Sequence, residues 1–231
     1  GRLRLRSARG AAMSQWLSFN ETIVPRLQIP GAPDQETAEC ASALREPMPL
    51  KTPWVLWEQV AGGHYATSEV CTFNTAQQFW SVWNGVPQPS ELLDNKRFFR
   101  ETNGAPTSID AIMVFRQGIT PEWEDKANEK GGHFQIQLKP PSGGGQIDEY
   151  WNNLVLAMVG ETLDCSQHVT GVRLVDKLSG KNKVTDAIRL ELWYHSKATQ
   201  QEVNLLQKSV ERVLTTRLDG SQGPQLKQDA L

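Results

Sequence analysis

Two neighbouring residues in the stretch Gly118–Phe134, GITPEWEDKANEKGGHF, are unusual for their surroundings. Trp123 stands directly before Glu124, on a segment otherwise rich in Pro, Gly and Lys, without apolar neighbours at helix or strand spacing. The indole therefore either folds back beneath its loop or is presented to a ligand. An alternative for the acids is that they only complement the N-terminus of a helix that begins at Pro121.

A second group of residues suited to binding lies in the stretch DAIRLELWYH. Strand side chains alternate, so one face carries three aliphatic residues and the other carries Arg189, Glu191 and Trp193. By the same alternation, Arg173 and Lys177 share a side of the preceding strand. Aromatic rings beside a cluster of cations suit a base that carries phosphates. The alternative is a Trp packed at a sheet edge, beside charges that only aid solubility.

Hydrophobic periodicity predicts the elements that hold these residues. Strands are expected to begin near Pro53, Ser68, Ala111 and His133. Two more strands are expected within residues 170–195, joined by a polar hairpin. Helical spacing predicts helices over residues 74–85, 147–161 and 199–218, with Asn74 capping the first and a Thr199-to-Glu202 capping box opening the last. This order predicts an α+β fold, a curved antiparallel β-sheet with three helices on one face and a concave, partly wet face opposite.

Length, charge and cysteine content limit the class of protein. The chain has 231 residues and a net charge of −2, which argues against a general polyanion binder but permits a small basic site. Three widely spaced cysteines, and no apolar run near the ~20 residues of a membrane span, predict a soluble cytoplasmic protein without disulfides or membrane contact. One domain is expected over residues 48–219. Residues 1–47, with an artificial extension before Met13, and residues 220–231 are expected to be largely disordered or flexible tails.

Five motifs in this chain occur in a family's order. They are MPLKTPWVLWEQ, FNTAQQFWSVWN, GITPEWEDKANEKGGHF, DEYWNNLVLAMVGE and IRLELW, between about Met48 and Leu218. Together they resemble the eukaryotic translation initiation factor 4E family, which binds the 7-methylguanosine cap of messenger RNA. The resemblance implies a cupped sheet of about eight strands, three helices on its convex face and a cap site on its concave face. It also implies a role in translation initiation or its regulation, in the cytoplasm and also the nucleus.

The resemblance assigns roles to the aromatic residues and the acid. Trp123 would form one slice of a sandwich around the cationic methylated guanine, and Glu124 would accept hydrogen bonds from the guanine edge. Trp193 would lie against the N7-methyl group. The first loop is shorter than usual in the family and contains no Trp, so its only aromatic residue, Tyr65, is assigned the second slice. Such a loop is similar to those of divergent trypanosomatid members.

The phosphates of the cap require cations. Arg189 matches one phosphate-binding position of the family. Lys177 stands where the family has a phosphate-binding arginine, so the planar fork of guanidinium donors is lost there. Lys181 or Lys183, in a hairpin longer than usual, would assist. His133 replaces a customary arginine, and the alternative is a polar histidine without a role.

A second surface is implied on the helical back. Four residues match the family's contacts with a short helical motif, carried by a 4G-type scaffold or a 4E-binding repressor: Pro49, Leu50, Trp80 and Leu156. The family's Leu-Glu pair is replaced by Asn152 and Asn153, so the carboxylate of that pair is missing here. The alternative for Trp80 is a purely structural core residue.

Other functions find less support in the residues. The chain has no H-E-x-x-H motif, and Val175 stands where a P-loop needs its first glycine. An enzyme is therefore not expected, nor a cofactor or a metal. The main alternative is an adaptor that has weakened or lost cap binding and acts through its helical back, because the first-loop Trp is missing.

Overall fold

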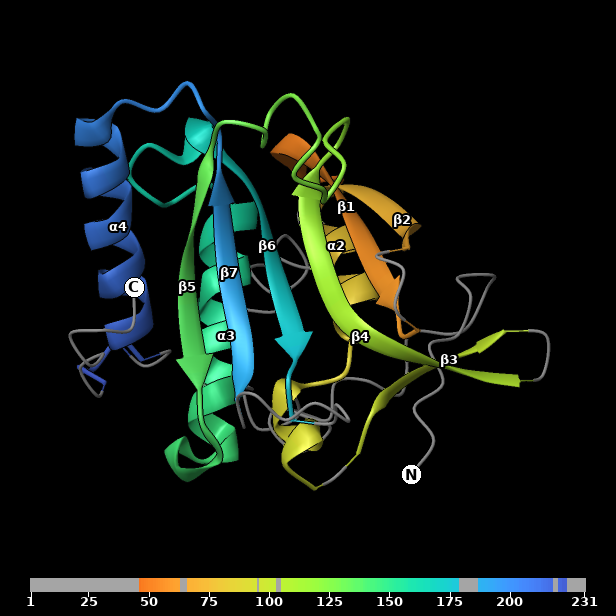
Figure 1. The fold of residues 1–231 in the computed structure, drawn as a ribbon. Coiled ribbons are helices and arrows are strands. Elements are labelled where there is room, and N and C mark those ends of the chain that lie inside the picture. The colour runs from red at the N-terminus through yellow and green to blue at the C-terminus, as the bar shows by residue number, and fades with distance from the viewer. Residues whose placement is uncertain are drawn as a thin grey trace, which may run out of the picture.

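A computed structural model describes residues 46–62, 66–94, 96–102, 105–178, 187–217 and 220–223 (Figure 1). Three residues assigned to the cap site from the sequence, Tyr65, Lys181 and Lys183, lie outside these ranges. Within the described ranges, none of the helices combines the length and apolar character needed to cross a membrane.

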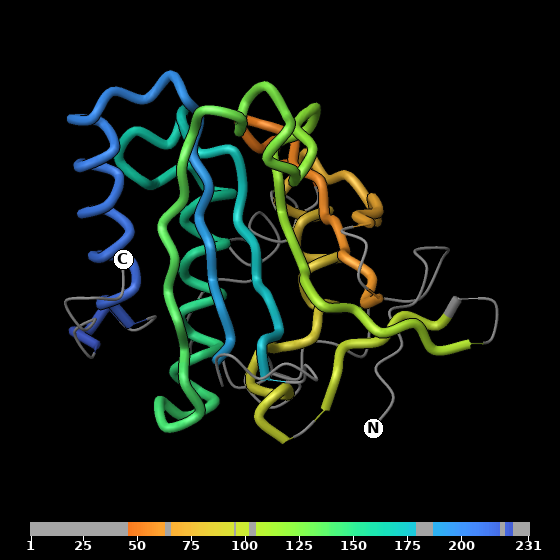
Figure 2. Tube along the Cα trace, in the orientation of Figure 1, coloured from red at the N-terminus to blue at the C-terminus, as the bar shows by residue number. Residues whose placement is uncertain are grey.

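The described residues form one curved antiparallel sheet of seven strands, where about eight were expected (Figures 1 and 2). Its order is β2-β1-β4-β6-β7-β5, and β3 pairs with β4 outside this path. The strands are β1 (Pro49–Val60), β2 (Thr67–Thr75), β3 (Phe98–Thr102), β4 (Ala105–Arg116), β5 (Gly132–Leu138), β6 (Val169–Asp176) and β7 (Ile188–Tyr194). The α+β class and the antiparallel sheet predicted from the sequence are confirmed.

Three α-helices of the described chain lie together behind the sheet or at its edge (Figure 1). They are α2 (Ala76–Trp83), α3 (Gly144–Val159) and α4 (Gln200–Thr215). The capping box of α4 is confirmed, with the Thr199 side chain accepting from the Glu202 N–H and the Glu202 carboxylate accepting from the Thr199 N–H. The predicted cap of α2 is wrong by one residue, because Thr75, not Asn74, accepts from the backbone there.

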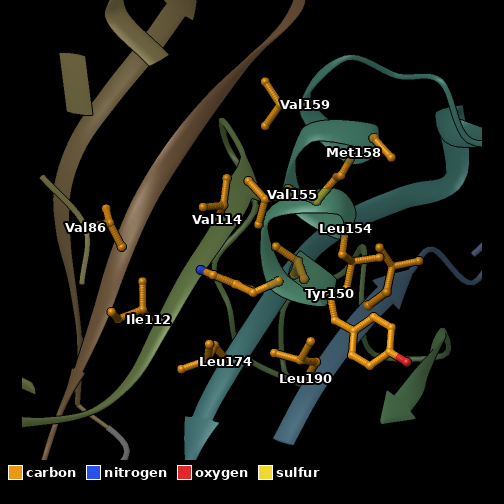
Figure 3. Close-up of a cluster of buried hydrophobic side chains, with 14 of the residues drawn as sticks. Val86, Ile112, Val114, Tyr150, Leu154, Val155, Met158, Val159, Leu174 and Leu190 are labelled. Carbon is orange, nitrogen blue, oxygen red and sulfur yellow. The ribbon is translucent and has the colours of Figure 1, made fainter. Parts of the chain in front are cut away.

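The main core lies between the helices and the sheet. Figure 3 shows Tyr150, Leu154, Val155 and Met158 of α3 against residues of the sheet strands. The three aliphatic residues of β7 belong to this core, as alternation predicted: Ile188, Leu190 and Leu192. Each such side chain contributes about 1.5–3 kcal/mol when fully buried. Burial of this one face obliges Arg189, Glu191 and Trp193 to point toward the other.

Strand β3 was not predicted from the sequence. It forms a hairpin with the first half of β4, from Phe98 opposite Ile109 to Thr102 opposite Ala105. Arg100 anchors it through a bidentate ion pair with the buried carboxylate of Glu58. Such a paired charge can stay buried because its hydrogen bonds are satisfied.

The chain also folds back after α4. Thr216 forms an isolated bridge with Gln222, and the Gly223 N–H donates to the Thr215 carbonyl. Residues 220–223 thus contact the end of α4. The domain boundaries at 47/48 and 219/220 stay predictions.

Candidate functional site

The loop between β4 and β5, residues 117–131, carries Trp123 and Glu124 at one end of the sheet (Figure 2). It consists of turns and bends, so the alternative of a helix begun at Pro121 is wrong. Asp125 accepts from the backbone N–H groups of Thr120 and Ala127, each at 2.8 Å. The buried amide of Asn128 donates to the carbonyls of Thr120 and Glu122 at 3.0 and 2.9 Å. Two short polar side chains therefore fix the loop from within, as in Asx turns.

Contacts outside the loop fix its position on the sheet. The Glu122 carboxylate accepts from the Thr67 hydroxyl of β2 at 3.1 Å. At the other end, a Cβ added to Gly131 or Gly132 would overlap the backbone or the ring of Tyr194. Only glycine permits the loop to enter β5 this close to β7.

Trp123 is presented at the surface, with 42% of the residue exposed. One face of its indole lies against Trp193, with ring centroids 3.8 Å apart and 20° between the planes. The ring of His133 lies 5.2 Å from that of Trp123. Glu124 is exposed, and no hydrogen bond or ion pair joins it to another residue of the described chain. Of the two sequence alternatives for Trp123, presentation to a ligand fits this arrangement.

Trp193 departs from the prediction of a wet concave face, because only 2% of it is exposed. Its indole is covered by Trp123 and meets the edge of Phe115 at 5.5 Å and 79°. Met113 completes this small cluster, separate from the main core. Gly171 lies beside it, and a Cβ added there would overlap the Phe115 ring. Strand alternation predicted the face on which Trp193 lies, but it could not predict that a distant loop would cover the ring.

A buried carboxylate lies next to this cluster. Glu191, only 3% exposed, accepts a hydrogen bond from the indole Nε1 of Trp193 at 3.0 Å. Its other neighbours are Arg173, with Nη1 at 3.5 Å, and Arg189, whose Nε lies 2.7 Å from Oε1 in an ion pair not aligned for a hydrogen bond. Arg173 also donates to the side chain of Gln59 on β1. One acid thus links the aromatic cluster to two cations.

Lys177 follows β6 and adds a third cation, at the end of the sheet where Arg189 lies. Burial lowers the pKa of Lys177, and the positive charges of Arg189 and Arg173 lower it further. Three neighbouring cations repel one another, so binding of an anion such as phosphate among them would be favourable. Within the described ranges, no three His, Cys, Asp or Glu side chains gather in a way that could hold a metal ion.

The cations and the aromatic pair lie at opposite ends of one strand. Trp193 is four residues from Arg189 along β7, which corresponds to roughly 13 Å of extended chain. The structure therefore brings Trp123, Glu124 and Trp193 together at one end and Arg189 and Lys177 at the other. The roles that the sequence missed are those of Glu191 and Arg173. Their signal was available, since each is a charge at an alternating position within an otherwise apolar strand.

The residues predicted for a partner lie on the helical side. Trp80 of α2 is 45% exposed, so the alternative of a purely structural core residue is wrong. Pro49 is exposed, and Leu50 and Leu156 are half-buried. An exposed Trp, together with half-buried aliphatic residues on the same side of the sheet, is typical of a surface that binds a helix.

Both asparagines of α3 are used within the fold. Asn152 accepts from the Trp83 indole N–H at 2.9 Å and donates to the Gln88 side chain at 2.8 Å. Asn153 donates to the Thr216 carbonyl at 2.9 Å, beyond the last turn of α4. These amides connect α3 to its neighbours, and because an amide is neutral, neither replaces the charge of the family's glutamate.

Comparison with known proteins agrees with this arrangement. The family model described as "Eukaryotic initiation factor 4E" matches residues 49–225. Eukaryotic translation initiation factor 4E of Saccharomyces cerevisiae is 36% identical over 122 residues, covering 50% of this chain and 50% of that protein. Factor 4E-1 of Schizosaccharomyces pombe is 36% identical over 130 residues, covering 54% and 53%. The chain spans about half the length of the curated relatives it matches.

Solved structures share the fold. Ascaris suum eIF4E-3 in complex with an m7G cap has a TM-score of 0.59 at 22% identity, covering 79% of this chain and 96% of that one. C. elegans eIF4E-3 in complex with the 4E-binding protein Mextli and a cap analog has a TM-score of 0.58 at 20% identity, covering 76% and 90%. The likeness to trypanosomatid members stays a prediction. Because the family model spans most of the chain and the sheet with its helices has the same arrangement, the chain belongs to the eukaryotic initiation factor 4E family.

Proposed function

We propose that this protein binds the 7-methylguanosine cap of messenger RNA and acts in translation initiation or its regulation. The observation that carries the proposal is the exposed Trp123–Glu124 pair on an internally braced loop, at one end of a strand whose other end bears cations. Family membership supports it, and so do relatives solved with cap ligands.

The base would stack on Trp123. One face of this indole lies against Trp193, so the ligand takes the opposite face, where Tyr65 of the first loop would close the sandwich. Methylation at N7 makes the guanine cationic, which adds a cation–π term to stacking worth about 1–3 kcal/mol per ring. In this arrangement Trp193 supports Trp123 from below. The N7-methyl group would reach Trp193 only after the upper indole shifted sideways.

Glu124 would read the guanine edge. Its exposed carboxylate has no partner within the described chain, so it can accept from the N1–H and N2–H groups of guanine. Adenine cannot offer this pair of donors. Unmethylated guanine offers them but lacks the ring charge, so discrimination against GTP would come from the aromatic stack.

The phosphates would reach toward Arg189 and Lys177, with Lys181 of the adjoining hairpin as a further candidate. The span of roughly 13 Å between Trp193 and Arg189 suits a ligand with a base at one end and a phosphate chain at the other. Only binding is required of these residues. The proposed role thus needs no catalysis, cofactor or metal, and its place is the cytoplasm.

Retention on an immobilised 7-methyl-GTP resin tests the proposal. We expect the protein to be retained and to be eluted by free 7-methyl-GTP but not by GTP. Trp123→Ala and Glu124→Ala should abolish retention, whereas Trp80→Ala, on the opposite side of the sheet, should spare it. Retention that survived both cap-site substitutions would refute the site assignment.

A second function is supported by the exposure of Trp80 on α2. The helical back, with Pro49, Leu50, Trp80 and Leu156, would bind an amphipathic helix of a 4G-type scaffold or a 4E-binding repressor. An adaptor that has lost cap binding would bind such a helix and fail on the resin. Calorimetry with a helical peptide, beside the resin assay, separates the two functions.

A further inference from the structure

Glu191 is a buried acid on the concave face of the sheet, with partners on two strands. Its carboxylate contacts the Trp193 indole N–H at 3.0 Å and Arg189 Nε at 2.7 Å, both on β7. It also contacts Arg173 Nη1 of β6 at 3.5 Å, directly across the strand pair. An ionised carboxylate at this depth costs several kcal/mol unless its partners compensate. The cost indicates that the position does more than fill space.

The geometry leaves one of these cations available to a ligand. The pairing with Glu191 involves Nε of Arg189, and the side chain is partly exposed. The terminal nitrogens of Arg189 have no partner in the described part of the chain. Arg173 is more deeply buried and also donates to Gln59, so it is held in place. A guanidinium whose Nε lies in an ion pair with a carboxylate can still present its two terminal nitrogens to a phosphate.

We propose that Glu191 is a positioning residue for phosphate recognition. It fixes Arg189 for the phosphate chain, holds Arg173 behind it, and keeps Trp193 in the orientation that supports Trp123. Glu191 lies midway along β7 between Trp193 and Arg189, so one carboxylate aligns both ends of the ligand site. This inference rests on the proposed cap function, whose ligand supplies the phosphates.

Two roles for Glu191 make different predictions. A residue that only stabilises the fold would, when replaced, weaken every ligand in the same proportion. A residue that positions phosphate cations would weaken ligands according to their phosphates. The useful quantity is therefore the phosphate increment, defined as the affinity for 7-methyl-GTP divided by the affinity for the nucleoside 7-methylguanosine.

The test is fluorescence titration of the full chain with both ligands. Glu191→Gln keeps the shape and an oxygen acceptor for the indole but removes the charge, and it should lower the phosphate increment about tenfold. Arg189→Gln should produce the same loss, and the double variant should lose little more than either single one, because the two residues act as a unit. An increment that is unchanged or larger in Glu191→Gln overturns the inference.

Two matched variants separate the base site from the phosphate site. Glu124→Gln should weaken both ligands by the same factor and leave the increment unaltered. Asp164→Asn removes one negative charge from an exposed ion pair beside α4 and should change neither affinity. A lowered increment in Asp164→Asn would mean that the loss does not depend on the position of Glu191, and would also overturn the inference.

Inorganic triphosphate distinguishes failure of this inference from failure of the proposed function. If the wild type ignores 7-methyl-GTP but is stabilised by triphosphate in a Glu191-dependent manner, the base assignment fails and the inference stands. If triphosphate raises the melting temperature equally in wild type and Glu191→Gln, the inference fails. If Glu191→Gln does not fold, two other variants test the inference: Glu191→Asp, which keeps the charge on a shorter side chain, and Arg189→Gln. Each should lower the phosphate increment, and an unchanged increment in both overturns the inference.

Discussion

The indole of Trp123 lies face to face with the indole of Trp193, although the two residues come from a loop and from a strand far along the chain. The upper ring is exposed and the lower ring is almost completely buried. The ring that would meet a ligand is therefore supported by a second ring that the ligand does not touch in this arrangement. Stacking of this kind contributes about 0.5–1.5 kcal/mol beyond area burial.

Two stacked indoles should give an exciton couplet in the far-ultraviolet circular dichroism. Trp123→Ala and Trp193→Leu should each remove the same couplet, because each removes one member of the pair. Trp80→Ala serves as the control and should leave it intact, since that indole contacts Phe79 and lies in another part of the fold. Spectra that are identical in wild type and Trp123→Ala would contradict the stack.

The buried amide of Asn128 should keep the loop between β4 and β5, residues 117–131, ordered. Asn128→Ala removes the side-chain donor that the carbonyls of Thr120 and Glu122 share and leaves each with only a backbone donor, from Glu122 and Asp125. The loss of these two buried hydrogen bonds should cost about 1–3 kcal/mol in local stability. We expect weaker binding of 7-methylguanosine together with faster amide hydrogen exchange across residues 117–131. Lys126→Ala, at an exposed position of the same loop, is the control. Unchanged exchange in Asn128→Ala would show that the loop is braced by other contacts.

Acid stability should depend on the capping box of α4. Hydrogen bonds from the backbone and side chain of Thr199, and then from His168, lower the pKa of Glu202 from 4.5 to about 2. The folded state thus favours the ionised carboxylate, so this contribution to stability is complete above pH 4.5 and is lost as the pH falls toward 2. Glu202→Gln should lower stability at neutral pH and flatten its decline between these two values. Denaturant unfolding across that range measures both effects.

The control for this prediction is Glu211→Gln, an acid on the same helix outside the capping box. It should leave the slope of stability against pH in the acid range as it is in the wild type. An equally steep acid decline in Glu202→Gln would assign the pH dependence to other carboxylates.

Gly171 should tolerate no side chain. A Cβ there would overlap the ring of Phe115, and overpacking of a filled cluster costs about 1–3 kcal/mol. Gly171→Ala should therefore lower the melting temperature and weaken 7-methylguanosine binding together. Gly145→Ala is the control, because nothing lies near a Cβ added at that position. A variant at Gly171 with wild-type stability would mean that Phe115 can move aside.

Local patterns predicted much of the fold. The capping box Thr199 to Glu202 and the alternation around Leu190 depend on a few neighbouring residues, and both are confirmed. The hairpin of β3 was missed because its first apolar residues, Phe98 and Phe99, are too few to show a period, and only pairing with β4 makes it a strand.

The candidate site was predicted less completely, because its geometry depends on contacts between distant segments. The pattern near Pro121 was compatible with a helix, and the side chains of Asp125 and Asn128 favour turns instead. The depth of Glu191 and the cover over Trp193 arise when a loop folds across the sheet, which no spacing within one strand can reveal.

The vacant side-chain position at Gly171 has a consequence that reaches the surface. Phe115 rests on it, Trp193 rests on Phe115, and Trp123 tops this column of rings. The position of the exposed Trp123 ring therefore depends on Gly171, three contacts away, because only glycine has a hydrogen atom in place of Cβ. Relatives with alanine at the position of Gly171 would need a smaller side chain in place of one of these rings to stack on a purine in the same way.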